Sequence, residues 1–370
     1  MPLLERDDRG LFCPAGNFHV DPWRPVPRAV VTHAHADHAR PGMGRYLTTI
    51  DGEHVLRPRV GRAATIDTLD YGERLSINGV TVSLHPAGHI LGSAQVRLEH
   101  GGEVCVISGD FKCDATPDGS VVPTEDRTCR AFEPVRCHAF VTESTFGLPV
   151  YKWPPQEDVF AELNKWWASN RDAGKASVLF SYSLGKAQRL LAGADASIGP
   201  VFCHGAVETC NRGYRDAGVE LPETTPVGQK KGARLFAGSL IVAPPSANGT
   251  TWMRRFGECS TAFASGWMLV RGQRRRRAVD RGFVLSDHAD WDGLLAAIKD
   301  SGAEKILVTH GNRDTLVKYL REQDVDAEML DAWFEGGEEA DEVPGTEAAD
   351  EDGDPVTDGD TSREGDTPQA

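Results

Sequence analysis

The stretch Thr32-His33-Ala34-His35-Ala36-Asp37-His38 decides how this sequence folds and what it can bind. It follows the apolar residues Ala29-Val30-Val31, which predict a buried strand that ends at the motif. Neutral imidazole nitrogens and carboxylate oxygens are ligands that Zn²⁺ accepts. His33 and His35 alternate, whereas Asp37 and His38 are adjacent and project differently, so one metal cannot easily bind all four. We therefore expect two metals, one for each pair; the alternative is a solvated, His-rich loop.

The spacing H-x-H-x-D-H resembles the signature of the metallo-β-lactamase superfamily. Three further segments resemble other motifs of that superfamily: FHVDPW with Asp21, HPAGHILGSA with His89, and VCVISGD with Asp110. Each segment borders an apolar, strand-like run, as is typical of a ligand held by a rigid sheet. The resemblance implies that Asp21 orients the metal-binding loop, that His89 binds the first metal, and that Asp110 bridges both metals.

The pattern of apolar residues changes near the middle of the chain. Residues 1 to about 147 alternate short apolar runs with Gly and Pro turns, which predicts mainly sheet. After Pro154-Pro155, apolar residues such as Val159, Leu163 and Trp167 share helical faces, and strand-like runs lie between the helices. Such alternation is typical of a parallel α/β sheet. The expected strands are 29–32, 80–84, 94–98, 104–108, 139–142, 177–180, 200–203, 239–243, 282–285 and 305–309, with a helix at 291–299.

This inserted α/β segment resembles the cap of the β-CASP branch of the superfamily, whose members are nucleases. The resemblance implies an α/β fold in which a metallo-β-lactamase αββα sandwich is formed by residues 1–147 and 281–335. The cap occupies residues 148–280, and residues 336–370 form a disordered acidic tail. Within the branch, the chain is most similar to ligase-associated DNA exonucleases and to archaeal messenger-RNA 3′-end processing factors, and this similarity covers nearly all of residues 10 to 334.

Three further motifs of this branch are present. Glu143 lies in VTESTFG, His288 in LSDHADWDG and His310 in VTHGN. The resemblance implies that His310 binds the second metal, while Glu143 and His288 pair to transfer a proton at the leaving group. Taken alone, either histidine could be an ordinary interior residue, but their placement after apolar strands and in motif order favours function. The residues expected to act in catalysis are Asp37, Asp110, Glu143 and His288.

The segment SYSLGKAQRLL, residues 181 to 191, resembles the phosphate-contacting turn of the cap. Backbone N–H groups near Gly185 and the helix dipole favour an anion, and Lys186 adds a positive charge. We therefore expect phosphate contacts from Ser181, Ser183, Gly185 and Lys186; the alternative is an ordinary capped amphipathic helix. A basic run at Arg271 and Arg274 to Arg277 could line a nucleic-acid path or decorate a surface turn.

Composition limits the class of protein. The chain has 370 residues, 40% of them hydrophobic, and no run approaches the ~20 apolar residues of a membrane span. The start, MPLLERDDRG, lacks the apolar core of a signal peptide. The eight cysteines show no C-x-x-C pairing, which favours buried thiols in a reducing cytoplasm over disulfides. We therefore predict a cytoplasmic protein without a membrane partner.

The net charge of −15 is concentrated at one end. Residues 335–370 contain fourteen acidic residues and one basic residue, so the other 334 residues carry 41 acidic and 39 basic groups. The body is therefore near neutral, which does not exclude an anionic substrate. The acidic segment is expected to be a solvating tail; the alternative is an electrostatic competitor for a groove that binds polyanions.

Together these features predict a metal-dependent nuclease that hydrolyses phosphodiester bonds. The expected mechanism uses hydroxide activated by two divalent metals, Zn²⁺ or Mn²⁺, with His288 and Glu143 as a general acid pair. We favour a DNA exonuclease of repair or processing, and the resemblance also suggests association with a DNA ligase or helicase. A histidine at position 310 is usual in RNA-acting members, so the alternative is an RNA 3′-end processing endo- or exoribonuclease.

Two other classes fit the sequence less well. A small-molecule metallo-hydrolase of the same fold would not need the inserted cap, Glu143 and His288. An inactive scaffold would be expected to lack metal ligands, and none is missing here.

Overall fold

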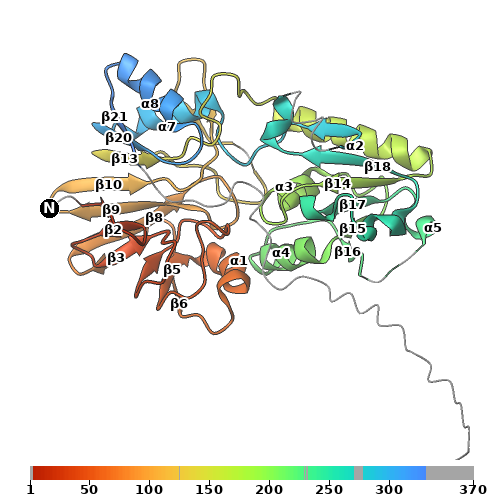
Figure 1. Ribbon diagram of the computed structural model, residues 1–370, viewed down its shortest axis with the longest axis horizontal. Coiled ribbons are helices and arrows are strands. Elements are labelled where there is room, and N and C mark those ends of the chain that lie inside the picture. Colours follow the sequence, from red (N-terminus) through yellow and green to blue (C-terminus); the bar gives the residue numbers. More distant parts are fainter. Residues whose placement is uncertain (1–2, 125, 229, 231, 271–277, 331–370) are drawn as a thin grey trace, which may run out of the picture.

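The structure is a computed structural model that describes residues 3–124, 126–228, 230, 232–270 and 278–330. Figure 1 shows two large β-sheets at one end of the molecule and a third at the other end. Helices accompany all three sheets, so the fold is mixed α/β, as predicted.

The first sheet has six strands in sequence order. They are β1 (Glu5–Arg6), β2 (Leu11–Cys13), β3 (Phe18–Val20), β4 (Ala29–Val30), β5 (Tyr46–Thr49) and β6 (Ile66–Leu69). The second sheet has the order β21-β20-β13-β10-β9-β8-β7. Its strands are β7 (Arg74–Ile77), β8 (Val80–Pro86), β9 (Ala94–His100), β10 (Glu103–Ile107), β13 (Ala139–Thr142), β20 (Lys305–Val308) and β21 (Asp326–Met329). A short hairpin pairs β11 (Asp114–Ala115) with β12 (Val121–Val122).

These two sheets pack face to face. Val20, Val30 and Leu47 of the first sheet share one hydrophobic cluster with residues of the second, including Val82 and Val96. Helix α1 (Ile50–Val60) contacts β5 and β6, whereas α7 (Trp291–Ser301) and α8 (Arg313–Glu322) cover the outer face of the second sheet. Helices therefore flank the paired sheets on both sides.

The third sheet is parallel throughout and has the order β16-β15-β17-β14-β18-β19. Its strands are β14 (Ala176–Phe180), β15 (Val201–Cys203), β16 (Thr225–Pro226), β17 (Leu240–Ala243), β18 (Cys259–Ala264) and β19 (Arg281–Phe283). The associated helices are α2 (Gln156–Asp172), α3 (Lys186–Gly193), α4 (Gly205–Asp216) and α5 (Ala233–Phe236), with 3₁₀ turns at Pro245–Ala247, Thr251–Phe256 and Gly266–Leu269.

Strand β14 shows why this sheet has continuous apolar runs. Leu179 packs into the cluster that contains α2 and α3, whereas Val178 and Phe180 pack into a second cluster on the opposite face. Because helices and turns cover both faces, every residue of the strand is buried.

The expected strands correspond to elements of the structure with small shifts at their ends. One of these strands lies at an expected domain boundary. Arg281–Phe283 is β19 and pairs with β18 in the third sheet, although we expected residue 281 to begin the return to the first two sheets. The expected basic run at 271–277 and the acidic tail at 336–370 lie outside the described residues.

Two expectations from composition can be compared with the structure. All eight cysteines are free thiols; six are buried, and Cys129 and Cys259 are partly exposed. Over the described parts of the chain, none of the helices combines the length and apolar character needed to cross a bilayer.

Candidate metal centre

Strand ends bring the expected site residues together. β10, β13 and β20 are neighbouring parallel strands of the second sheet, and their carboxyl ends lie at one edge. The chain continues from these ends to Asp110, Glu143 and His310 respectively. The loop after β4 carries the H-x-H-x-D-H motif, and the loop between β8 and β9 carries His89. Side chains from five separate segments therefore meet at one edge, as is usual for sites in sheet proteins.

The first group comprises His33, His35, His89 and Asp110, which are all buried and whose ligand atoms lie within 4.8 Å of one another. His35 Nδ1 is 3.1 Å from His33 Nε2 and 3.0 Å from His89 Nε2. Asp110 Oδ2 is 3.5 Å from His33 Nε2. Ligand atoms around a tetrahedral metal with bonds of ~2.1 Å are separated by ~3.4 Å. The donor set and its spacing therefore fit one Zn²⁺-sized ion.

The second group comprises Asp37, His38 and His310, whose ligand atoms also lie within 4.8 Å of one another. Asp110 Oδ2 is 3.5 Å from His38 Nε2, the same distance as from His33 Nε2 in the first group. Asp110 Oδ1 is buried and has no hydrogen-bond partner among the described residues. A carboxylate between two imidazole groups, with one oxygen lacking a partner, fits an ion that the protein itself does not supply.

Each histidine of the two groups uses its other ring nitrogen to bind the protein. The partners are Thr32 Oγ1 for His33, Leu184 O for His35, Asp21 Oδ2 for His38, Asp287 O for His89 and Thr309 Oγ1 for His310. A carbonyl oxygen only accepts, so His35 Nε2 and His89 Nδ1 carry the proton. Their other nitrogens then face the group as lone pairs, which is the arrangement that metal-binding histidines adopt.

Four of these partners were not predicted from the sequence. Thr32 and Thr309 each directly precede a histidine, so a repeated Thr-His pair was a signal that could have identified them. Leu184 and Asp287 contribute backbone carbonyls, which every residue has, so their identity carries no signal.

Asp21 lies beneath the H-x-H-x-D-H loop, where we expected an orienting carboxylate. Its oxygens accept hydrogen bonds from the Thr32 N–H at 2.8 Å and the Thr32 hydroxyl at 2.6 Å, and Oδ2 is 2.8 Å from His38 Nδ1. Asp21 has φ +45° and His310 has φ +51°, a region that non-glycine residues rarely adopt. Such backbone strain commonly occurs at functional sites.

Burial and charge set the protonation of this centre. Burial holds the pKa of His33 and of His89 well below the usual range, and it lowers the pKa of His310 to about 3. Burial also disfavours the charged form of His38, but Asp37 and Asp110 outweigh it and raise the His38 pKa well above its usual value. Most of the imidazoles are therefore neutral, which is the form that binds metals.

A buried histidine–glutamate pair lies beside Asp110. His288 Nδ1 is 3.0 Å from Glu143 Oε1 and 2.9 Å from Oε2, and Glu143 Oε1 also accepts the Phe111 N–H at 2.8 Å. Burial lowers the pKa of His288, but the adjacent Glu143 carboxylate outweighs it and raises that pKa to about 10. The Glu143 carboxylate therefore favours the protonated form of His288, and Asp110, Glu143 and His288 have side-chain atoms within 4.8 Å of one another.

The turn expected to contact phosphate makes several contacts within the protein. The Gly185 N–H donates to Gln188 Oε1 at 2.7 Å, which caps α3 internally. Lys186 Nζ is 3.1 Å from Asp287 Oδ1, and both side chains are buried. The Gly185 N–H and the Lys186 charge are thus already satisfied within the protein. The hydroxyls of Ser181 and Ser183 are buried and have no hydrogen-bond partner among the described residues.

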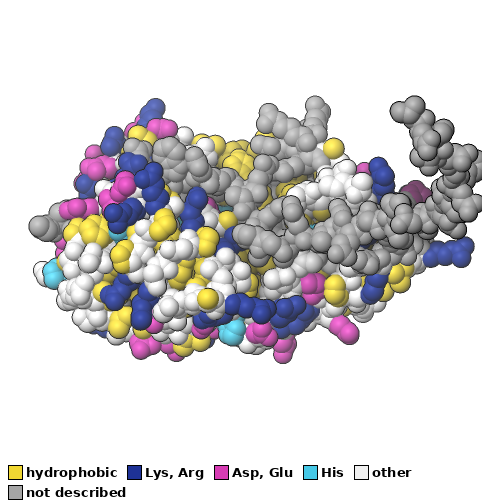
Figure 2. Space-filling model, turned by 60° about the horizontal axis from the view of Figure 1, so that its bottom comes forward, with side chains coloured by type: hydrophobic (Ala, Val, Ile, Leu, Met, Phe, Trp, Pro, Cys, Tyr) yellow, Lys and Arg dark blue, Asp and Glu magenta, His cyan; other side chains and the backbone are white. Residues whose placement is uncertain are grey.

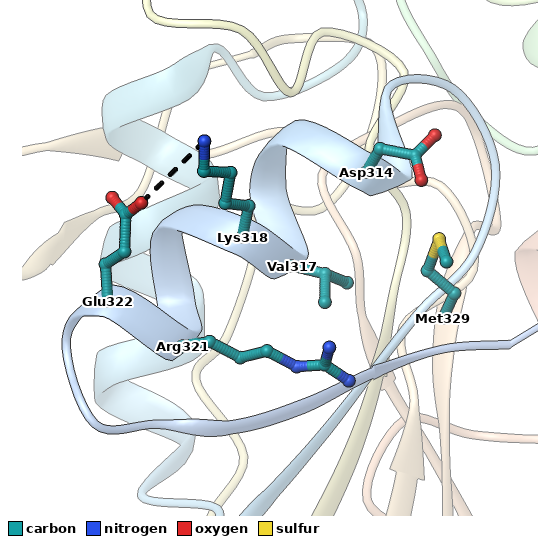
Figure 3. A pocket seen from close by; sticks show the side chains of 6 residues that line it. All are labelled: Asp314, Val317, Lys318, Arg321, Glu322 and Met329. Atoms are coloured by element: carbon teal, nitrogen blue, oxygen red, sulfur yellow. Dashed lines mark ion pairs between the residues drawn. The ribbon is translucent and has the colours of Figure 1, made fainter.

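Two surface features lie outside this centre. A pocket of about 340 Å³ beside α8 is lined by Asp314, Val317, Lys318, Arg321, Glu322 and Met329, and it shares no residue with the histidine groups (Figure 3). On the face shown in Figure 2, Lys and Arg side chains are interspersed with Asp and Glu side chains, consistent with the near-neutral charge of the body. Neither feature offers the donor set found at the strand ends.

No family model matches the chain. A probable DNA ligase from Opitutus terrae is 30% identical over 332 residues, which cover 88% of this chain but 31% of the relative. The endoribonuclease YSH1 of Yarrowia lipolytica is 30% identical over 34% of this chain and 14% of the relative. Cleavage and polyadenylation specificity factor 73 of Drosophila melanogaster is 26% identical over 51% of this chain and 28% of the relative. The chain thus spans a third or less of the length of each of these relatives.

A solved structure of a protein of unknown function from Enterococcus faecalis V583 has a similar fold, with a TM-score of 0.53 and 11% sequence identity. The match covers 83% of this chain and 80% of that chain. Because the identity is low, this similarity concerns the fold alone.

Proposed function

The chain belongs to the β-CASP nuclease branch of the metallo-β-lactamase superfamily, and on this premise we propose that it is a metal-dependent DNA exonuclease of repair or processing. The observation that carries the proposal is the position of Asp110. Its carboxylate lies between two groups of imidazole nitrogens and beside the His288–Glu143 pair. This arrangement suits hydrolysis of a phosphodiester, in which a water is activated on one side and a leaving oxygen is protonated on the other.

The domain division is proposed as the sequence predicts it. We propose that residues 1–147 and 281–335 form the metallo-β-lactamase domain and residues 148–280 the inserted cap; at the boundary, Arg281–Phe283 pairs with β18 of the third sheet. Residues 336–370 hold thirteen of the acidic residues and are proposed to be an acidic tail.

Two divalent ions, Zn²⁺ or Mn²⁺, would be held by these side chains. The first ion would be held by His33, His35, His89 and Asp110, and the second by Asp37, His38, Asp110 and His310. When bound, such ions polarise the phosphodiester and make water acidic enough to act as a nucleophile at neutral pH.

His288 is the proposed general acid. Its Nδ1 is held by Glu143, so Nε2 is the nitrogen that can give its proton to the departing oxygen. Glu143 keeps the imidazole protonated and fixes the orientation of the ring. Asp21 orients the loop that carries four of the metal ligands.

Substrate phosphate contacts are assigned to Ser181 and Ser183, whose buried hydroxyls lie in the turn that precedes α3. The same turn reaches the first histidine group, because Leu184 O accepts from His35 Nε2 at 3.3 Å. A phosphate at the metals would therefore lie close to this turn. Gly185 and Lys186 of the same turn, which also contact Gln188 and Asp287, are proposed to contribute to phosphate binding.

DNA is favoured as the substrate because the similarity to the probable DNA ligase extends over 88% of the chain. Association with a DNA ligase is proposed for the same reason. The second candidate is RNA 3′-end processing, which the similarity to an endoribonuclease and to a cleavage and polyadenylation factor favours.

The test is cleavage of end-labelled single- and double-stranded DNA and of matched RNA, each with Zn²⁺ and with Mn²⁺. We expect stepwise shortening of DNA, and no cleavage by Asp110→Asn. Cleavage of RNA alone would establish the second candidate. No cleavage of any nucleic acid by a protein that carries two metals would reject the nuclease proposal.

A further inference from the structure

Helix α3 carries two cations that are almost fully buried. The side chains of Lys186 and Arg189 are 1% and 2% exposed. Lys186 pairs with Asp287, and Arg189 Nε is 2.7 Å from Asp126 Oδ2. Replacing a buried ion pair by apolar residues is often neutral or stabilising, so stability is a weak explanation for two such pairs on one helix.

The remaining donors of Arg189 reach two separate loops. Nη2 donates to His89 O at 3.0 Å and to Gly88 O at 3.2 Å, and Nη1 donates to Ser286 O at 3.3 Å. These carbonyls belong to residues that lie about 100 positions away from Arg189 in either direction. The planar guanidinium therefore joins the loop of His89 to the loop of His288 in a fixed geometry.

A second bond joins the same two loops. His89 Nδ1 is 2.8 Å from Asp287 O, the carbonyl next to Ser286. Arg189 thus binds the backbone at both ends of this bond: the carbonyls of Gly88 and His89 at one end and that of Ser286 at the other. Lys186 holds the side chain of the same Asp287.

The N-terminal turn of α3 lies against the metal centre. Gly185 has φ +87°, and a Cβ atom there would lie 2.2 Å from Ile90 Cγ2, so only glycine permits this approach. Leu184 O accepts from His35 Nε2. Figure 1 shows α3 on the side of the third sheet that faces the first two sheets. The helix and the turn before it thus contact His35 and His89, two ligands of the first group. His38 and His310 are instead held by Asp21 and Thr309.

We propose that Arg189 is a positioning residue: it fixes His89 and His288 relative to each other, so the affinity of the first metal group depends on the placement of α3. The inference rests on the proposed function, because it assumes that the histidine groups bind metal. The proposal predicts different effects on the two groups. Helix α3 contacts the segments that hold His35 and His89, whereas Asp21 and Thr309, which contact His38 and His310, lie outside this helix.

The test compares Zn²⁺ binding by wild-type protein and by Arg189→Lys, using full-length chains stripped of metal and titrated in a calorimeter. Lysine keeps the charge near Asp126 but cannot donate to three carbonyls at once. Loss of such an outer partner typically weakens metal binding roughly 10- to 100-fold. We expect this loss for one metal and an unchanged affinity for the other. Combining Arg189→Lys with His310→Ala should weaken the one remaining metal.

Two further variants guard against a general loss of structure. The matched control is Arg171→Lys on α2, because Arg171 also pairs with an aspartate and donates to a carbonyl, but lies 43% exposed on the cap surface. It should bind both metals like the wild type. Arg189→Met combined with Asp126→Asn removes both charges of the Arg189–Asp126 pair and leaves no unpaired charge there. This double variant tests the same contacts if Arg189→Lys does not fold.

Equal weakening of both metals in the Arg189 variants would show general loosening and overturn the inference, as would unchanged affinity for both. The inference and the proposed function fail separately. A wild-type protein that binds two metals but cleaves no nucleic acid rejects the function, while the difference between the variants still decides the role of Arg189. A wild-type protein that binds no Zn²⁺ rejects both.

Discussion

At the scale of single residues, the proposed chemistry depends most on Asp110, which is expected to contact both metals. We predict that Asp110→Asn abolishes cleavage and weakens binding of both metals, because a carboxylate lying 3.5 Å from a histidine of each group becomes a neutral amide. Elemental analysis should find about two metals per chain in the wild type and fewer in the variant. An unchanged metal count would refute the bridging role.

His288 is predicted to act on turnover and not on metal binding. His288→Ala should retain both metals while the rate falls roughly 10²- to 10⁴-fold, the usual contribution of general acid catalysis. Glu143→Gln should cause a similar loss, and the double variant should lose little more, because the two residues act as one unit. A substrate with a better leaving group should rescue His288→Ala but not His310→Ala, which should lose the second metal. Metal loss in His288→Ala would instead make His288 a ligand.

The pH dependence follows from the same pair. Glu143 raises the pKa of His288 to about 10, so the acid is protonated at neutral pH and loses its proton only as the pH rises through that value. The rate should therefore fall on the alkaline side, at or below about pH 10, since bound metals add positive charge nearby. Glu143→Gln removes the carboxylate that raises this pKa, so the alkaline fall should move to lower pH. A pH–rate profile that keeps the same alkaline limb in both proteins would contradict the assignment.

At the scale of elements, the start of α3 depends on one glycine. Gly185→Ala places a Cβ atom 2.2 Å from Ile90 Cγ2 at a residue with φ +87°. With ψ −74° this backbone conformation is sparsely populated and costs a non-glycine residue roughly 1–3 kcal/mol, and the clash adds to this. We expect a lower midpoint of thermal unfolding and weaker binding of the first metal. Gly174→Ala, at φ +69° with no atom within 4 Å, is the control for backbone strain without the clash.

The elements themselves were predictable to different degrees. Strands β8, β9, β10, β13 and β14 were expected from dense runs of apolar residues, and the apolar face of α2 was expected from its helical spacing. Helix α1 was not expected, because Pro58 lies inside it and its apolar residues form little of a face. Strand β19 was expected in part, but its place in the third sheet follows from pairing with β18, which periodicity does not encode.

At the scale of the whole molecule, the acidic segment is predicted to be dispensable for folding. Deleting residues 336–370 removes thirteen of the acidic residues and none of the apolar residues that form the six hydrophobic clusters of the described structure. The midpoint of thermal unfolding should stay unchanged. If the segment competes with nucleic acid, the truncated protein should bind DNA more tightly, most of all at low salt. A midpoint several degrees lower would show that the segment packs on the body.

The sequence by itself determined which side chains could form the centre and the class of the fold. The ligands of the H-x-H-x-D-H loop are close in sequence, so their spacing alone limits how they can bind a metal, and apolar periodicity indicates strands and helices locally. Only the tertiary structure decided what holds those ligands in place. His35 is held by a carbonyl 149 residues away and His89 by one 198 residues away. It also decided that Lys186 faces Asp287. Contacts between distant segments, made largely through backbone groups that all residues share, leave no local pattern to read.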